Sequence, residues 1–306
     1  MQSLSFYFRN PNAILLSLLM RLNWAFPDKL YLKLLYRLKM GKRLNLKRPK
    51  TFNEKLQWLK LYNRKPEYTT MVDKYAVKEY VANIVGEEYI IPTLGVWDTP
   101  NDIDWDSLPD KFVLKTTHGG GGNGVVICKD KSNFDKQKAV NILWNSYKLD
   151  IYRVLREWPY KNVPKRIIAE KYMNDKTSND LVDYKFTCFN GYADNVMVCT
   201  ERSTGKPKFY FFDREWNLMP LNIRGKNTNK NFKLPKPSCM DKMFELAGKL
   251  SEGIPFLRVD FYCVENHPYF GELTFFPDSG FDKNLLKETE EYFGNKIILP
   301  AINNNN

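Results

Sequence analysis

The sequence predicts an α+β protein in which antiparallel hairpins alternate with groups of helices. Residues 110–129 (DKFVLKTTHGGGGNGVVICK) are two short apolar runs joined by a glycine-rich turn, the pattern of a β-hairpin. The apolar runs over 183–213, separated by turns such as Asn190-Gly191, predict further antiparallel strands, and 256–276 predicts a last hairpin. Helical patterns precede and separate these strands. A chain of 306 residues is long enough for about two or three subdomains.

Composition restricts the class of protein. An apolar content of 43% and an aromatic content of 15% are typical of a globular chain. A membrane span needs roughly eighteen apolar residues, whereas the longest run here, Ala13–Met20, has eight, with no small-residue cleavage site after it. Five scattered cysteines and two histidines favour a reducing compartment and argue against a disulfide framework or a zinc site. We therefore expect a cytoplasmic protein without a cleaved signal peptide.

The excess positive charge lies in the N-terminal segment. Residues 1–65 hold 15 of the 47 Lys and Arg but two of the 35 Asp and Glu, a balance of +13, so the other 241 residues carry −1 of the overall +12. Helices are predicted over 11–26 and 27–40, each with a proline near its start. The second combines an apolar stripe with a basic one, formed by Leu30, Leu34, Leu35 and Leu38 and by Lys29, Lys33 and Arg37 respectively.

Three explanations of this charge are open. The helix could lie on an anionic membrane surface, or it could pack its leucines on the protein and leave its cations in solvent. Nucleic acid is a third candidate, but no recognisable nucleic-acid-binding motif accompanies the charge, so we do not expect it as a partner.

Capping signals and periodicity predict the remaining elements. Thr51 and Glu54 have the spacing of a capping box, which predicts a helix over 53–62. The polar loop over 224–237 contains five Lys and Arg and is longer than a simple connection requires. Further helices are predicted over 73–85, 136–158, 239–248 and 284–293, and further strands over 89–97 and 166–173.

The glycine-rich hairpin is a candidate phosphate-binding loop. Four consecutive glycines, Gly119 to Gly122, form its tip, and Lys115 ends the incoming strand. Glycine lets backbone N–H groups approach a large anion, because no Cβ obstructs them and positive φ costs little. A flexible surface turn is the alternative. The Walker pattern is excluded, because the lysine precedes the glycines and a strand follows them.

The last hairpin carries a second group of charged residues. Residues two apart on a strand share a face, so Arg258 points with Asp260, and Glu272 points with Thr274. Carboxylates are rarely buried unless they are paired or bind metal. Asp260 and Glu272 could hold the Mg²⁺ of a nucleotide, which takes one or two carboxylates together with phosphate oxygens. The alternative is an ion-pair network with Arg258 that holds the sheet together.

Taken in order, these motifs resemble the ATP-grasp superfamily over roughly residues 45 to 300. They resemble most closely its TupA-like branch, which is named for teichuronopeptide synthesis and found with genes for cell-surface polysaccharides. The resemblance implies an ATP-grasp fold, with two α+β subdomains gripping the nucleotide between antiparallel sheets, and it implies ATP and Mg²⁺ as cofactors. The motifs are Asp73-Lys74, Pro92, Lys115 with the glycine hairpin, Glu170-Lys171-Tyr172-Met173, Asp183, Arg258-x-Asp260 and Glu272-x-Thr274.

The resemblance also implies which residues bind the nucleotide. Lys185 is a further candidate for a phosphate contact, from its position alone, because it lies two residues after Asp183 and on the same strand face. The implied set is Lys74 and Lys115 on the phosphates, Gly119, Gly120, Gly121 and Gly122 in the tip, Glu170, Lys171 and Met173 along the adenine, and Asp183 at the ribose.

The metal site departs from the superfamily at one position. Asp260 and Glu272 match the Mg²⁺ ligands, and Arg258 matches the arginine that holds the reacting carboxylate or acyl phosphate, so Arg258 and Lys115 are the implied catalytic residues. The superfamily usually has Glu-x-Asn at the second metal site, where this chain has Thr274. A threonine hydroxyl is a weaker ligand than an amide carbonyl, so we expect one metal to bind loosely or through water.

The resemblance implies an ATP-dependent carboxylate–amine ligase, in which a carboxylate attacks the γ-phosphate and an amine then displaces phosphate to form an amide. The branch implies a glycan acceptor that bears a uronic acid, free or lipid-linked, and an amine co-substrate. Alternatives are a kinase acting on a hydroxyl, a glycosyltransferase and a non-enzymatic nucleotide-binding scaffold. A lipid-linked acceptor would give the basic N-terminus a use, at the inner face of the membrane.

These expectations divide the chain into successive segments. They are a basic helical segment over 1–65, the N-terminal part of the ATP-grasp core over 66–109, the glycine-hairpin subdomain over 110–173, the C-terminal subdomain with the metal site over 174–300, and a tail over 301–306.

Overall fold

The computed structural model divides into two compact units. The first is made of Met1–Arg64, Asp150–Lys161 and Phe276–Asn306, and the second of Lys65–Leu149 and Asn162–Phe275. None of the described helices has both the length and the apolar character of a membrane span. The residues that the structure describes are 11–120, 122, 124–174, 181–201, 204–229 and 231–302.

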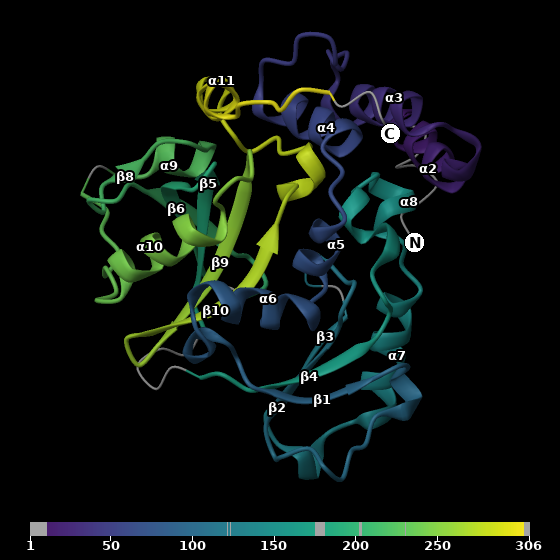
Figure 1. Cartoon of the computed structure of the whole chain (residues 1–306), viewed down its shortest axis with the longest axis vertical. Helices are drawn as coiled ribbons and strands as arrows, with labels where there is room; N and C mark the ends of the chain where they lie inside the picture. Colours follow the sequence, from purple (N-terminus) through teal and green to yellow (C-terminus); the bar gives the residue numbers. More distant parts are fainter. Residues whose placement is uncertain are drawn as a thin grey trace. The chain divides into compact units, whose positions relative to one another are not determined.

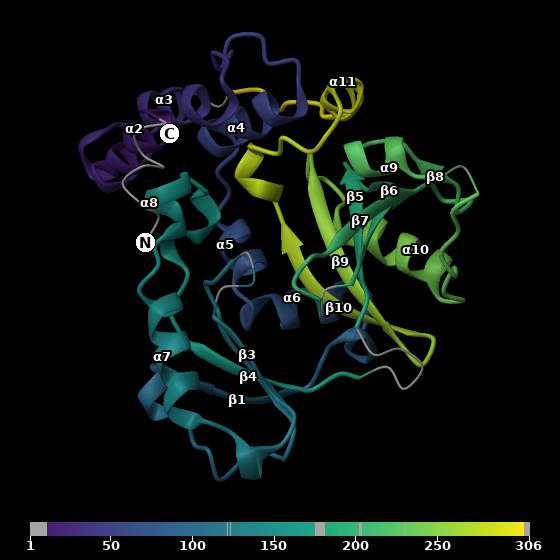
Figure 2. The ribbon, with the colours of Figure 1, turned by 180° about the vertical axis from the view of Figure 1, so that it is seen from behind.

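The first unit is helical in the part that the structure describes (Figures 1 and 2). The Thr51 side chain accepts a hydrogen bond from the Glu54 N–H, and Glu54 Oε2 accepts one from the Thr51 N–H at 3.2 Å, so the predicted capping box is confirmed. Phe52 packs edge-on against Phe293, with ring centroids 5.4 Å apart. The elements are α2 (Pro11–Arg21), η1 (Asn23–Ala25), α3 (Asp28–Met40), α4 (Phe52–Tyr62), α8 (Ile151–Leu155), η7 (Pro277–Gly280) and α11 (Lys287–Lys296), and η5 (Trp158–Asn162) ends at the boundary with the second unit.

A fully buried lysine joins three segments of the first unit. Lys60 lies on α4, and its Nζ donates hydrogen bonds to the carbonyl oxygens of Leu155 at 2.9 Å and of Ser279 at 2.7 Å. Burial lowers the pKa of Lys60 to about 7, and the nearby Glu157 carboxylate opposes this decrease. The segments that meet here come from α4, α8 and η7, so this one side chain ties distant parts of the sequence into one unit.

The second unit contains two antiparallel sheets, and its predicted hairpins β2–β3 and β9–β10 are both present (Figures 1 and 2). The four-stranded sheet has the order β1-β4-β2-β3 and the six-stranded sheet the order β10-β9-β5-β6-β7-β8. The strands are β1 (Thr93–Trp97), β2 (Phe112–Thr116), β3 (Val125–Cys128), β4 (Ile167–Lys171), β5 (Asp183–Phe189), β6 (Tyr192–Thr200), β7 (Lys208–Phe212), β8 (Leu218–Met219), β9 (Leu257–Val264) and β10 (His267–Thr274). The helices are α5 (Glu67–Val72), α6 (Ala76–Val85), η2 (Glu87–Tyr89), η3 (Pro100–Asp102), η4 (Lys131–Asn133), α7 (Lys136–Tyr147), α9 (Ile223–Asn227) and α10 (Met240–Leu250).

The predicted helix over 136–158 is wrong in its length. Helix α7 ends at Tyr147, and α8 begins after Asp150. The Asp150 carboxylate accepts a hydrogen bond from the Arg153 N–H at 2.8 Å, so Asp150 starts a new helix instead of continuing the old one. The apolar pattern continues across this break, which is why periodicity alone missed it.

Alternation along the strands leaves one face of each sheet for polar side chains. On β2, Phe112 and Leu114 are fully buried in a core with β3, β4 and α7, which puts Lys115 on the other face. On β5, Phe186 packs against Phe244 of α10, with ring centroids 4.8 Å apart. The neighbouring residues of β5 therefore face away from α10, and they include the charged residues of the candidate site.

Candidate active site

The glycine-rich tip is closed against helix α7. Gly124 has φ of +74°, and a Cβ at this position would lie 2.2 Å from Ser146 Cβ, so the position requires glycine. Ser146 Oγ in turn lies 2.9 Å from Thr116 Oγ1, at the end of β2. Gly122 also has positive φ, +75°, with open space around it. Of the four predicted tip glycines, Gly119, Gly120 and Gly122 are described, and Gly121 lies outside the described residues.

Lys74 fixes the start of the glycine tip with both its backbone and its side chain. Its N–H donates to the Thr117 carbonyl at 3.0 Å, and its Nζ donates to the Gly119 carbonyl. The adjacent Asp73 is buried and forms an ion pair with Arg166 at 2.6 Å, just before β4. Burial lowers the pKa of Lys74. The sequence-predicted phosphate lysine therefore lies next to the first predicted glycine.

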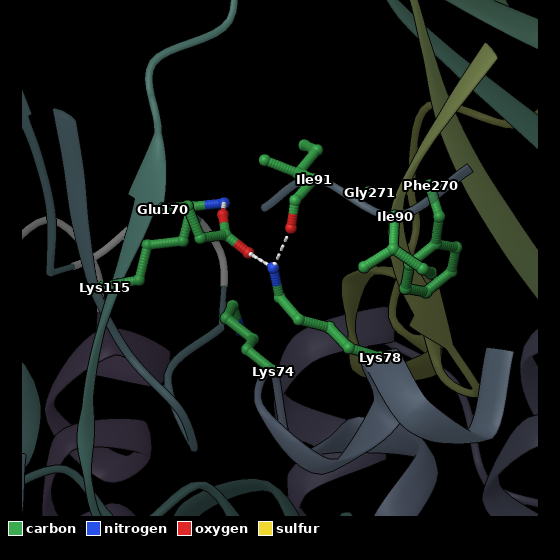
Figure 3. A pocket seen from close by; sticks show the side chains of 8 residues that line it. All are labelled: Lys74, Lys78, Ile90, Ile91, Lys115, Glu170, Phe270 and Gly271. Carbon is green, nitrogen blue, oxygen red and sulfur yellow. Dashed lines mark hydrogen bonds and ion pairs between the residues drawn. The ribbon is translucent and has the colours of Figure 1, made fainter. Parts of the chain in front are cut away.

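Lys74, Lys78 and Lys115 line a small pocket together with the Glu170 carboxylate (Figure 3). Glu170 of β4 forms ion pairs with Lys115 of β2 and, at 2.6 Å, with Lys78 of α6. Lys78 Nζ also donates to the Ile91 carbonyl at 2.6 Å. Burial by itself would raise the pKa of Glu170, but its ion pairs with Lys115 and Lys78 lower this pKa to about 2.

These ion pairs fill most of the space between the lysines. The remaining volume is about 10 Å³, roughly the space of one water molecule. A phosphate group therefore cannot lie between these lysines unless the side chains move. The lining residues are Lys74, Lys78, Ile90, Ile91, Lys115, Glu170, Phe270 and Gly271.

The six-stranded sheet carries its charged residues in cross-strand rows. Residues that are partners in antiparallel register share a face of the sheet. Lys185 of β5 is opposite Asp260 of β9, which is opposite Glu272 of β10. In the next row, Arg258 of β9 is opposite Thr274 of β10. The pairings that the two-residue spacing predicts, Arg258 with Asp260 and Glu272 with Thr274, are thus confirmed as shared faces.

Arg258 and Lys185 hold the predicted metal ligands in ion pairs. Arg258 binds Asp260 in a bidentate pair, at 2.7 Å and 2.8 Å, and also binds Glu272 Oε1 at 2.7 Å. Lys185 pairs with the second oxygen of Asp260 and lies 3.6 Å from Asp183. The ion-pair network considered from the sequence is therefore present. Asp260 is nearly inaccessible to solvent, and these ion pairs compensate its buried carboxylate.

The pocket lysines and the carboxylates of the six-stranded sheet belong to one electrostatic site. The pocket of Figure 3 is lined by Lys74 and Lys115 and also by Phe270 and Gly271, the two residues that precede Glu272 on β10. Partial burial by itself would raise the pKa of Glu272. Four surrounding cations instead lower it to about 2, namely Arg258, Lys74, Lys185 and Lys115.

The donor set suits Mg²⁺ delivered with a nucleotide. Asp260 and Glu272 supply two carboxylates and Thr274 a hydroxyl, which are the hard oxygen ligands that Mg²⁺ prefers. Thr274 Oγ1 donates to Glu272 Oε1 at 3.3 Å, so it lies beside the second carboxylate. Among the described residues, no group of three or more His, Cys, Asp or Glu side chains could hold a metal ion. A cation bound by Asp260 and Glu272 would therefore also need phosphate or water oxygens.

Two of the predicted nucleotide residues do not line this pocket, and one residue that lines it was not predicted from the sequence. Lys171 is the last residue of β4, and its side chain is exposed. Met173 follows the strand, and neither residue lines the pocket. Asp183 is buried on β5, on the face of Lys185. Lys78 was not predicted. Its spacing of four residues from Lys74 within the helix predicted over 73–85 was the available signal, although the structure begins α6 only at Ala76.

Sequence comparison assigns the chain to a family. Residues 54–298 match the family described as TupA-like ATPgrasp. The chain belongs to the TupA-like ATP-grasp family. This membership confirms the predicted family and its ATP-grasp fold of the α+β class, and it fits the predicted class of enzyme, an ATP-dependent ligase. No protein of curated function matches the chain.

The solved structures that match this TupA-like protein are only distantly similar to it. D-alanine–D-alanine ligase from Helicobacter pylori is 15% identical, with a TM-score of 0.42 over 74% of this chain and 58% of that one. The Bacillus anthracis ligase of the same name, complexed with ATP, is 15% identical, with a TM-score of 0.37 over 67% and 53%. The biotin carboxylase domain of Hydrogenobacter thermophilus 2-oxoglutarate carboxylase, with MgADP, is 17% identical, with a TM-score of 0.37 over 67% and 40%. The chain thus spans between 40% and 58% of the lengths of these relatives. The predicted cofactors, ATP and Mg²⁺, are those of its superfamily.

Proposed function

We propose that this TupA-like protein is an ATP-dependent carboxylate–amine ligase. An oxygen of the substrate carboxylate attacks the γ-phosphorus of ATP and ADP leaves, which gives an acyl phosphate. The amine nitrogen then attacks the acyl carbon, inorganic phosphate leaves, and an amide remains. The observation that carries the proposal is a single pocket lined by Lys74, Lys78 and Lys115 and by the segment of β10 that leads into Glu272. Phosphoryl transfer depends on such convergent cations and carboxylates more than on a protein nucleophile.

The lysines of the pocket are proposed to bind the phosphates of ATP in place of the Glu170 carboxylate. Lys115 and Lys78 now neutralise Glu170, and Lys74 donates to the backbone of the glycine tip. Bound ATP would offer these lysines phosphate oxygens instead, and the tip would offer backbone N–H groups. The remaining proposed contacts follow the family resemblance, with Gly119 to Gly122 at the phosphates, Glu170, Lys171 and Met173 along the adenine, Asp183 at the ribose and Lys185 as a further phosphate contact.

The sheet carboxylates are proposed to hold Mg²⁺ beside those phosphates. Asp260 and Glu272 would be its protein ligands, with Thr274 as a weak or water-mediated one. When bound, the metal neutralises charge on the transferred phosphoryl group. Arg258, which lies 2.7 Å from both carboxylates, is placed to hold the reacting carboxylate or acyl phosphate when they turn to the metal. Lys115 and Arg258 are therefore the proposed catalytic cations.

The acceptor is proposed to be a glycan that bears a uronic acid, and the second substrate an amine. The support for a glycan is the TupA-like branch itself, which is associated with cell-surface polysaccharides such as capsule. A lipid-linked glycan at the inner face of the membrane would make the protein cytoplasmic and peripheral. The net charge of +13 over residues 1–65 supports this location, because anionic lipids attract such segments.

ADP release tests the reaction. The purified protein is assayed with ATP, Mg²⁺ and a panel of sugar acids and amines, and we expect ADP release that requires both an acid and an amine. Mass spectrometry of the product should show loss of one water relative to the two substrates. ADP release with neutral sugars alone would indicate a kinase. Transfer from a nucleotide sugar without ATP would indicate a glycosyltransferase, and either result would reject the ligase.

A further inference from the structure

Seven of the sixteen exposed large hydrophobic residues in the described part of the chain lie between Ile14 and Leu34. On α2, Ile14 and Leu18 are four residues apart, so they lie on one face of the helix, and Leu22 directly follows the helix end. Trp24 of η1, directly after α2, is 74% exposed. Helices α2 and α3 pack side by side (Figures 1 and 2). We call the exposed side chains of α2, η1 and α3 the α2–α3 face, and its apolar members, apart from Trp24, are 38% to 52% exposed: Ile14, Leu15, Leu18, Leu22, Leu30 and Leu34.

The exposed side of α3 is not the one that the sequence predicts. The sequence predicts one apolar stripe that contains Leu30, Leu34, Leu35 and Leu38. The structure buries Leu35, with Tyr31, Leu32 and Tyr36, because the aromatic residues complete the packed face. Leu30 and Leu34 remain outside, next to the exposed cations Lys29, Lys33 and Arg37. Apolar and cationic side chains are therefore neighbours on the same outer surface.

The α2–α3 face carries positive charge with little opposing charge. Asp28 is the only Asp or Glu among the first 53 residues. Its carboxylate forms ion pairs with Arg64 at 2.6 Å and with Arg156 at 2.9 Å. The exposed cations of the face are Arg21, Lys29, Lys33 and Arg37.

Arg156 holds the base of the α2–α3 face. Its guanidinium donates to the carbonyl oxygens of Asn23 at 2.6 Å and of Phe26 at 3.2 Å, which flank Trp24. The same guanidinium lies 4.2 Å from the centre of the Tyr31 ring. These hydrogen bonds fix the turn that carries Trp24, while the indole ring of Trp24 faces solvent. A fixed, exposed tryptophan beside leucines and cations is typical of a surface that enters a lipid interface.

We propose that the α2–α3 face docks on an anionic lipid bilayer, with Trp24 and the leucines in the boundary between headgroups and acyl chains. Large exposed apolar patches mark interaction sites. The cations favour lipid phosphates over a neutral partner, because each cation near an anionic surface strengthens binding. This inference deepens the membrane location given under the proposed function. It rests on the proposed function only for the suggestion that the acceptor is a lipid-linked glycan. It differs from simple charge attraction, because apolar side chains that enter the bilayer continue to bind when salt screens the cations.

The test is sedimentation of the full-length protein with phosphatidylcholine vesicles, with and without phosphatidylglycerol, over a range of salt concentrations. We expect binding to the anionic vesicles that weakens with salt but persists at high salt. Replacing Lys29, Lys33 and Arg37 together by Gln should weaken binding about a hundredfold at low salt. The matched control replaces the exposed Lys111, Lys129 and Lys138 by Gln, and it should bind like the wild type.

The apolar contribution needs its own variant pair. Trp24→Ala with Leu18→Ser should abolish the binding that remains at high salt, and Ile223→Ser, at an exposed isoleucine elsewhere, should have no effect. Circular dichroism checks that each variant is folded. Wild-type protein that ignores anionic vesicles at low salt would overturn the proposal. So would Trp24→Ala with Leu18→Ser binding like its control, since attachment would then be electrostatic only.

A second copy of the chain is the competing occupant of the α2–α3 face. If sedimentation velocity finds a wild-type dimer that Trp24→Ala with Leu18→Ser converts to a monomer, and vesicles do not bind, the face is a dimer interface and the lipid proposal is rejected. ADP release with a soluble acid and amine, measured on the same variants, separates this proposal from the ligase. We expect the docking variants to keep that activity. Loss of ADP release from every protein, including the wild type, would reject the ligase and leave the vesicle result standing.

Discussion

Replacing Lys115 by Met tests whether the hairpin lysine serves only an ion pair or also a nucleotide. The change keeps the length of the side chain and removes its charge. In the structure Lys115 is one of two lysines that neutralise Glu170, whose pKa they lower from 4.5 to about 2. At about 1.4 kcal/mol per pKa unit, this net lowering of the Glu170 pKa, with the opposing effect of burial included, corresponds to a stabilisation on the order of 3 kcal/mol at neutral pH. Lys115 has the larger effect of the two, so Lys115→Met should lower stability at neutral pH by about 2 kcal/mol.

The pH dependence of this loss identifies its origin. A carboxylate with a depressed folded-state pKa contributes stability that is fully present above its unfolded value and lost as the pH falls through the folded value. For Glu170 that window runs from 4.5 down to about 2. Urea denaturation should therefore show a difference between wild type and Lys115→Met that is constant near pH 7 and shrinks below about pH 4.5.

Nucleotide affinity decides the functional part of the prediction. A hydrogen bond to a charged group contributes about 1.5–3 kcal/mol, so losing the phosphate contact should weaken ATP binding about ten- to a hundredfold in calorimetry. We expect turnover to fall by several orders of magnitude. Lys129→Met, at an exposed lysine after β3 of the same hairpin, is the matched control and should change neither quantity. Normal ATP affinity in Lys115→Met, with the stability loss present, would show that Lys115 belongs to an ion pair alone and would refute the phosphate role.

Two other sites have testable consequences. Asp260→Asn and Glu272→Gln should each lose Mg²⁺-dependent ADP release, and a large fall in melting temperature with normal Mg²⁺ dependence would instead indicate that these carboxylates only compensate Arg258. Because the folded-state pKa of Lys60, about 7, lies below its ordinary 10.5, the unfolded chain binds more protons between these values, so wild-type stability should rise with pH across this window. Between pH 7 and 9, the free energy of unfolding of Lys60→Met should rise by up to about 3 kcal/mol less than that of the wild type. An identical rise in both proteins would contradict a buried Lys60 with a lowered pKa.

Local signals predicted those parts of the fold that depend on residues near in sequence. The capping box depends only on the spacing of three residues between Thr51 and Glu54, and the structure contains it. The shared face of Arg258 and Asp260 follows from strand alternation alone. Periodicity failed between α7 and α8, because the Asp150 side chain offers the backbone a new helix start that an apolar pattern does not reveal.

The contents of the nucleotide pocket could not be derived from the sequence. Glu170 meets Lys78 because β4 lies between β1 and β2 and helix α6 reaches the same pocket, and this register joins residues about ninety positions apart along the chain. The family resemblance implies that Glu170 binds the adenine. The structure adds that it now neutralises the lysines expected to bind phosphate.

The same arrangement recurs at both ends of the site. Lys115 and Lys78 share Glu170, while Arg258 and Lys185 share Asp260, so each group of cations already has a carboxylate partner. Buried charges are tolerated only when they are compensated. A folded protein that must bind a polyphosphate with such cations therefore needs internal anions in the absence of nucleotide. ATP and Mg²⁺ would then exchange partners instead of adding charge, the phosphates taking the cations and the metal taking Asp260. On this reasoning the ion pairs and the proposed nucleotide site are two states of one set of residues, and the ion pairs alone do not argue against binding.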